Sequence, residues 1–180
     1  IGEVKQVAGL NVLDLDTDTT VSAYNTTVTG NTTIESDRAT AGAGITHTLG
    51  TLSIGTQTLN VDKGISVTSG TAGVTVGATT LTGNPTFSVT NNGSVTGQLT
   101  LGALAGGGSA RTITKADTGT LIFGTNASSV TAGSSLVVNG GIAQVNTATA
   151  LGTGAFNVTV NATTASGTAA FNLNNVSQTI

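Results

Sequence analysis

The stretch Val76-Gly-Ala-Thr-Thr80, followed by Gly83 and Phe87-Ser88-Val89, recurs without gaps as Val160-Asn-Ala-Thr-Thr164, Gly167 and Phe171-Asn172-Leu173. A third copy aligns Val28-Thr29-Gly30-Asn31-Thr32-Thr33-Ile34 with Leu81-Thr82-Gly83-Asn84-Pro85-Thr86-Phe87. The strand-like parts of these copies alternate apolar residues with Thr, Ser or Asn, which is the period of a β-strand. Such self-similarity is typical of repeat proteins, so we expect stacked units of strand and turn.

The same alternation continues outward from these copies, for example in Leu99-Thr100-Leu101 and Val158-Thr159-Val160. Short clusters such as Gly106-Gly107-Gly108 and Asn139-Gly140-Gly141 interrupt it and predict turns. No stretch places apolar residues at helical spacing among helix-forming residues, and the best candidate, 101–105, runs directly into three glycines. We therefore expect an all-β chain with essentially no helix.

The turns favour a coil that climbs in one direction, because hairpin-type Asn-Gly dipeptides do not occur at regular intervals. That architecture is a parallel β-solenoid, in which Val and Leu of successive coils stack inward while Thr and Asn form ladders outward. Like charges stacked above one another would repel, which explains why only 7% of the residues are charged. At roughly 20 to 30 residues per coil, the chain would form about six to nine coils.

Composition excludes several function classes. The five Lys and Arg residues are scattered and the net charge is −3, so nucleic-acid binding is not expected. Apolar runs such as Leu136-Val137-Val138 are too short for a transmembrane segment. Cys, Met and Trp are absent, which leaves no disulfide or thiolate metal site and, with the low charge, is typical of secreted bacterial surface proteins. We expect an extracellular or cell-surface location.

Three phrases resemble a known family: Ile113-Thr-Lys115-Ala-Asp-Thr-Gly119-Thr-Leu121-Ile-Phe123, Val138-Asn-Gly140-Gly-Ile142, and Ala150-Leu-Gly152-Thr-Gly154-Ala-Phe156-Asn-Val158. This order of a Lys, a Gly-Thr-Leu strand, a Gly-rich turn, a second strand and an Ala-Leu-Gly-Thr-Gly turn resembles the autotransporter-associated β-strand repeat of bacterial surface proteins. The resemblance implies a right-handed β-helix stalk on a secreted passenger, without catalytic or cofactor-binding residues.

We expect a single solenoid over residues 1–180, which the resemblance divides into three parts. Residues 111–180 would form autotransporter-associated repeat-like coils, residues 28–110 would form spacer-type coils, and residues 1–27 would form N-terminal coils. Both ends lie in strand-like sequence without a capping helix, and uncapped β-edges favour stacking. We therefore expect end-to-end self-association along the solenoid axis.

Three alternating carboxylates, Asp14, Asp16 and Asp18, would share one face of an extended strand. Carboxylate oxygens are ligands that Ca²⁺ prefers, so one hypothesis is a calcium site. An EF-hand loop would need Gly at position 19 and Glu at position 25, where the chain has Thr19 and Asn25. The other hypothesis is a solvated strand edge that binds no cofactor.

The sequence does not point to an enzyme. His47 is the only histidine, its spacing assigns it no nucleophile or acid partner, and we expect it to point outward from a strand. Glu3 and Glu35 are the only glutamates, so a glycosidase pair would need an aspartate beside one of them. The pairs Asp37-Arg38 and Asp62-Lys63 instead suggest local charge pairing.

These observations favour a structural or adhesive extracellular stalk or filament-forming segment, with surface glycans as a further partner. The alternative is a carbohydrate-binding or carbohydrate-cleaving β-helix, although Tyr24 is the only Tyr and there is no Trp to stack on sugars. A third hypothesis is an ice-binding solenoid, suggested by Thr-x-Thr at Thr46-His-Thr48 and Thr56-Gln-Thr58. The irregular spacing of this tripeptide disfavours it, because a lattice-matching face repeats at every coil.

Overall fold

A computed structural model describes residues 6–7, 10–124, 129–161 and 168–177. Among these residues it contains nineteen strands and no helix, as predicted. The strands are β1 (Gln6–Val7), β2 (Leu10–Asp16), β3 (Thr26–Val28), β4 (Thr32–Asp37), β5 (Gly42–Ala43), β6 (Thr46–Thr48), β7 (Leu52–Ile54), β8 (Thr58–Lys63), β9 (Val67–Thr75), β10 (Thr79–Leu81), β11 (Thr86–Val89), β12 (Val95–Leu101), β13 (Leu104–Ala105), β14 (Thr112–Ala116), β15 (Thr120–Phe123), β16 (Ser135–Val138), β17 (Gly141–Val145), β18 (Asn157–Val160) and β19 (Ala169–Asn172).

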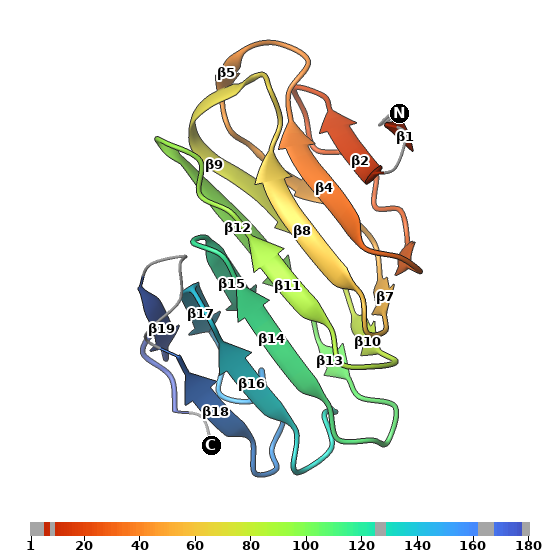
Figure 1. Cartoon of the computed structure of the whole chain (residues 1–180), viewed down its shortest axis with the longest axis vertical. Helices are drawn as coiled ribbons and strands as arrows, with labels where there is room; N and C mark the ends of the chain where they lie inside the picture. Colours follow the sequence, from red (N-terminus) through yellow and green to blue (C-terminus); the bar gives the residue numbers. More distant parts are fainter. Residues whose placement is uncertain (1–5, 8–9, 125–128, 162–167, 178–180) are drawn as a thin grey trace.

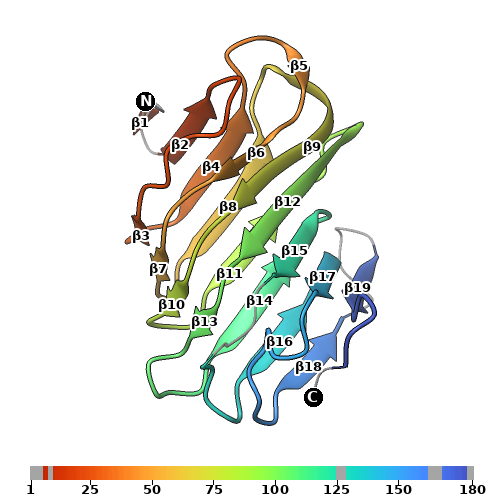
Figure 2. The same ribbon diagram turned by 180° about the vertical axis from the view of Figure 1, so that it is seen from behind.

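The strands form a parallel β-solenoid of about six turns, which confirms the predicted fold class. The front sheet has the order β1-β2-β4-β8-β11-β14-β16-β18, the back sheet β19-β17-β15-β12-β9-β5 with β6 also paired to β9, and the side sheet β13-β10-β7-β3. Only β1 pairs antiparallel within these sheets. The chain climbs from one end of the long axis to the other, as the colours of Figure 1 show, and Figure 2 shows the back sheet.

Apolar residues of successive coils stack inward at the same register position. On the back sheet, one column holds Val74, Leu99, Leu121 and Ala143, all fully buried. Each buried Val or Leu side chain contributes about 1.5–3 kcal/mol, so the columns along the three faces supply most of the stabilisation. The predicted stacking of like residues is confirmed in this column.

Polar residues form the predicted outward ladders. On the front sheet, Thr58, Thr86, Thr114, Val137 and Thr159 occupy one column in successive coils. Amides also bond from coil to coil, because Asn161 Nδ2 donates to Asn139 Oδ1 at 2.7 Å.

Coil length changes near residue 111. Hydrogen bonds between neighbouring coils join residues 27 and 28 positions apart at Asn31–Thr58 and Asn84–Thr112. Later they join residues 23 and 22 positions apart at Arg111–Ser134 and Asn139–Asn161. In the described part of the chain, the side sheet has no named strand after β13. Variable coil length explains why equal spacing in sequence is not equal position in space.

The two gap-free sequence copies therefore lie on different faces, contrary to a simple repeat. Phe87 is in β11 of the front sheet and Phe171 is in β19 of the back sheet, while positions 162–167 of the second copy lie outside the described residues. The shorter copy is structurally equivalent. Asn31 Oδ1 accepts the Thr58 N–H at 2.9 Å, and Asn84 Oδ1 accepts the Thr112 N–H at 3.0 Å.

Candidate functional site

Most charged residues of the described chain lie along one edge of the solenoid, which we call the charged edge. Here front-sheet strands end and the chain turns toward the back sheet, and because the strands are parallel their C-terminal ends meet at the same edge. The charged edge comprises Asp16, Asp18, Asp37, Arg38, Asp62, Lys63, Lys115 and Asp117. The sequence analysis described the basic residues as scattered, and only the coil register brings them together with the acids.

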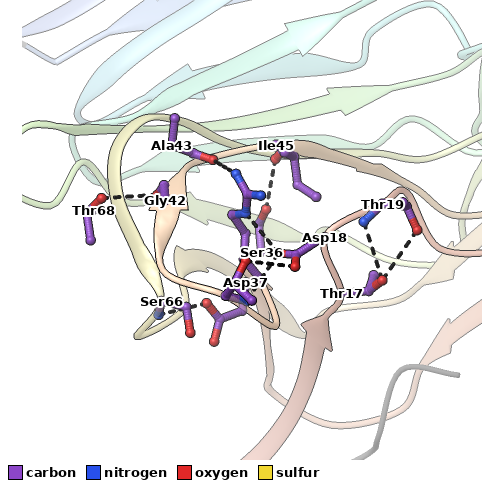
Figure 3. A network of polar contacts seen from close by, with 12 residues as sticks. Thr17, Asp18, Thr19, Ser36, Asp37, Gly42, Ala43, Ile45, Ser66 and Thr68 are labelled. Atoms are coloured by element: carbon purple, nitrogen blue, oxygen red, sulfur yellow. Dashed lines mark hydrogen bonds and ion pairs between the residues drawn. The ribbon is translucent and has the colours of Figure 1, made fainter.

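Asp18 and Arg38 tie the first coil to the second (Figure 3). Arg38 Nε donates to Asp18 Oδ1 at 3.1 Å, and its Nη1 donates to the Ala43 carbonyl at 2.7 Å. Thr40 donates its N–H to Asp18 Oδ1 at 3.1 Å and its hydroxyl to Oδ2 at 2.8 Å. The hydrogen bonds from Thr40, followed by that from Arg38, lower the pKa of Asp18. The predicted pairing of Arg38 with Asp37 is wrong, since Asp18 is its partner.

Asp37 and His47 fix the next corner from inside. Asp37 is 3% exposed, and its Oδ1 accepts the Ser66 N–H at 2.9 Å (Figure 3). His47 is fully buried, with Nε2 2.9 Å from the Asp37 carbonyl oxygen. The predicted outward position of His47 is wrong, because its register partner is Val74 of the inward column. A Cβ on Gly64 would lie 2.0 Å from Asp37 Cγ, so this close approach requires glycine.

Ser36, Asp37 and His47 are all buried at this corner, but they do not form a nucleophile and base pair. The Ser36 hydroxyl donates to the Ile45 carbonyl at 3.1 Å (Figure 3). The Asp37 carboxylate faces the Ser66 backbone, and the imidazole faces a backbone carbonyl instead of a carboxylate. A triad needs the base to contact both the nucleophile and the acid side chain. These groups serve backbone atoms of the turn.

The three aspartates of the calcium hypothesis have separate environments. Asp14 is 9% exposed within β2, Asp16 is exposed at its end, and Asp18 is held by Arg38 and Thr40. Within the described ranges, no group of three or more His, Cys, Asp or Glu side chains is arranged to hold a metal ion. The structure therefore does not bring these three residues together, and calcium binding stays a prediction.

Carboxylates do stack from coil to coil at one place. Asp14 pairs in register with Glu35, and Glu35 pairs with Asp62. The expectation that like charges avoid stacking is wrong for this column. It holds further along the chain, since residues 118–180 contain no Asp, Glu, Lys or Arg.

Lys115, the lysine of the family-like phrase, is a buried cation in the core. Its side chain is fully buried in a column between Phe87 and Val138. Its Nζ donates to the Asp117 carbonyl at 2.7 Å, to the Gly140 carbonyl of the next coil at 3.2 Å, and to the Ala116 carbonyl. Burial lowers the pKa of Lys115 to about 8, while the charge of Asp117 acts in the opposite direction. The ammonium joins two successive corners.

Asp117 and Gly141 shape these corners. Asp117 has φ 61°, and its carboxylate accepts a hydrogen bond from Ser88 of the preceding coil. Gly141 has φ 63°, and a Cβ there would lie 2.2 Å from the Gly119 carbonyl oxygen. Left-handed backbone and close coil contact explain the Gly-rich turn in the phrase.

The front sheet offers a second candidate surface. We call Thr58, Thr86, Thr114 and Thr159 the Thr column. None of these four hydroxyls makes a hydrogen bond to another residue in the part of the chain that the structure describes. Back-sheet side chains instead bond to one another, as from Gln144 Nε2 to Asn146 Oδ1 at 2.7 Å. The Thr column therefore presents free donors and acceptors on a regular face.

Comparison with known proteins adds no relative. No protein-family model, no curated protein and no solved structure matches the chain. The resemblance to the autotransporter-associated repeat thus depends on its three phrases alone. Among the described residues, no helix is long and apolar enough to cross a membrane.

Proposed function

We propose that this chain is a structural stalk segment of a secreted, extracellular surface protein of the autotransporter-associated repeat type. The observation that carries the proposal is the use of its buried polar groups. Lys115, Asp37 and His47 all bond to backbone atoms of corner turns, and Lys115 reaches across two coils. Groups that could support chemistry elsewhere are committed here to holding coils together, as a rigid spacer requires.

The continuous stack supports a load-bearing role. Every coil is hydrogen-bonded to its neighbours along at least two faces, so pulling along the axis must break whole rows of backbone bonds together. End-to-end association would extend the same rows into a filament. Adhesion to surface glycans would use the exterior, which presents neutral hydroxyls and amides.

Surface labelling tests the location and the stalk role. Antibodies raised against the purified chain should label intact cells of the source organism, and external protease should remove the label. Labelling that needs permeabilised cells would contradict the proposal. Electron microscopy of the native material should then show rods, whose absence from labelled surfaces would contradict the stalk role.

A second candidate function is binding of an uncharged polysaccharide through the Thr column, favoured by its free hydroxyls. Thr86→Val and Thr114→Val remove two hydroxyls at nearly constant shape, and Thr75→Val and Thr100→Val on the back sheet are matched controls. Loss of polysaccharide pull-down only in the front-sheet variants would support this function. Inhibition of ice growth lost in the same variants would instead support the ice-binding hypothesis, and no effect in either assay would remove both.

A further inference from the structure

We infer that Asn92 is a site of spontaneous modification, at which the side-chain amide is lost as ammonia and an aspartyl or isoaspartyl residue remains. The chain contains two Asn-Gly dipeptides, Asn92-Gly93 and Asn139-Gly140. Glycine has no side chain, so its backbone nitrogen can approach the preceding amide with least hindrance. The fold places the two dipeptides in opposite environments. This inference goes beyond the proposed function and does not depend on it.

Asn92 lies in an open turn between β11 and β12, at the tip that projects beside β9 (Figures 1 and 2). Asn92 and Val95 exchange two backbone hydrogen bonds of 3.0 and 3.1 Å, which leaves Gly93 and Ser94 as a two-residue turn. Gly93 has φ 63°, the positive value that a type II′ turn needs at its first central residue. Asn92, Gly93 and Ser94 are exposed, and a Cβ on Gly93 would meet nothing within 4 Å.

The reacting groups of this turn are not held by the fold. Neighbouring Asn91 is fully engaged, since its Oδ1 accepts the Gly97 N–H at 2.9 Å and its Nδ2 donates to the Thr118 carbonyl at 2.9 Å. The Asn92 amide and the Gly93 N–H, in contrast, make no hydrogen bond to any other described residue. Attack therefore breaks no intramolecular bond.

The reaction needs only water as co-reactant. The Gly93 nitrogen loses its proton and attacks Asn92 Cγ, the C–N bond of the amide breaks, and ammonia leaves. The resulting five-membered imide then takes up one water, which opens either of its two C–N bonds. Opening one bond gives aspartate, and opening the other gives isoaspartate, in which the main chain runs through the former side chain. No electron transfer occurs.

Asn139-Gly140 is an internal control. The Asn139 Oδ1 accepts from Asn161 Nδ2 at 2.7 Å, and the Asn139 N–H donates to the Lys115 carbonyl at 2.8 Å. Gly140 is buried, and its carbonyl accepts from Lys115 Nζ at 3.2 Å. Attack at Asn139 must first open this corner, so the folded state should slow it by about tenfold or more.

Modification at Asn92 would change a local packing unit. Val95, directly after the turn, forms with Val67 and Ala72 a small buried cluster separate from the main core. Isoaspartate adds one backbone atom to the turn, so the two bonds between Asn92 and Val95 cannot both keep their register. We expect this cluster to loosen while the main core stays intact.

Peptide mapping by mass spectrometry tests the inference on the folded chain, incubated in mildly alkaline buffer at physiological temperature. Replacement of NH₂ by OH should accumulate at Asn92 about tenfold or more faster than at Asn139, and isoaspartate should be the larger product. In urea the two sites should react at similar rates, because only the fold separates them. Asn92→Gln, which closes a less favourable ring, should remove the fast phase without changing the melting temperature. Equal rates at Asn92 and Asn139 in the folded chain, or a fast phase that survives Asn92→Gln, would overturn the inference.

Discussion

The buried ammonium of Lys115 should make the solenoid more stable in alkaline solution. Burial lowers the pKa of Lys115 to about 8, from 10.5 for an unhindered lysine, so between these values the unfolded chain holds a proton that the folded chain has lost. The free energy of unfolding therefore rises with pH across this window and is flat with respect to this group on either side. At 1.36 kcal/mol per pKa unit, the full rise is about 3 kcal/mol.

Urea unfolding of the wild type and of Lys115→Met, at neutral pH and at intervals up to about pH 10.5, measures this rise. Methionine keeps the length of the side chain within an apolar column, and it cannot titrate. The difference between the two pH profiles isolates Lys115 from the other alkaline groups. We expect the wild type to gain about 3 kcal/mol relative to the variant as pH increases.

Asp117→Asn gives an independent check on the same reasoning. The charge of Asp117 raises the pKa of Lys115, so its removal should move the start of the rise to lower pH. Asn is suited to the positive φ of 61° at this position, which limits any structural change. Parallel pH profiles for the wild type and Lys115→Met would refute the argument that burial destabilises the charged form.

Three further predictions concern the charged edge. Because hydrogen bonds lower the pKa of Asp18 below 3.8, its contribution is present above that value and is lost as pH falls through the folded pKa; the melting temperature of the wild type should fall more steeply in acid than that of Asp18→Asn. Gly64→Ala should cost about 1–3 kcal/mol or more in urea unfolding because its Cβ would overlap Asp37, whereas Gly30→Ala, whose Cβ would lie 3.3 Å from a flexible Asn11 amide, should cost less. Ca²⁺ should leave the melting temperature unchanged, since Arg38 and Thr40 already hold Asp18; a rise abolished by Asp16→Asn would establish the calcium site.

The predicted right-handed coil and the division at residue 110 have different standings. Handedness stays a prediction of the family resemblance. At the predicted division the coil shortens, from residues 28 positions apart at Asn84–Thr112 to 23 positions apart at Arg111–Ser134. Shorter coils after this point give the change in phrase a structural counterpart, while the family assignment of each part remains a proposal.

The sequence by itself determined the all-β class, the parallel stack and the neutral ladders. Alternation such as Leu99-Thr100-Leu101 assigns one side of each strand to the core, and this depends only on the two-residue period of a strand. The strength of this local signal explains why no helix was expected and none occurs in the described residues.

Only the tertiary structure decided which residues meet between coils. Coils vary in length, so register cannot be counted along the sequence. Register placed His47 above Val74 in the core, paired Arg38 with Asp18, aligned Asp14 with Glu35, and brought Lys115 to the Gly140 carbonyl. Inter-coil contacts are set by corner geometry, where close backbone approach and positive φ decide how many residues each turn takes up. That geometry results from packing across coils and leaves little trace in local sequence.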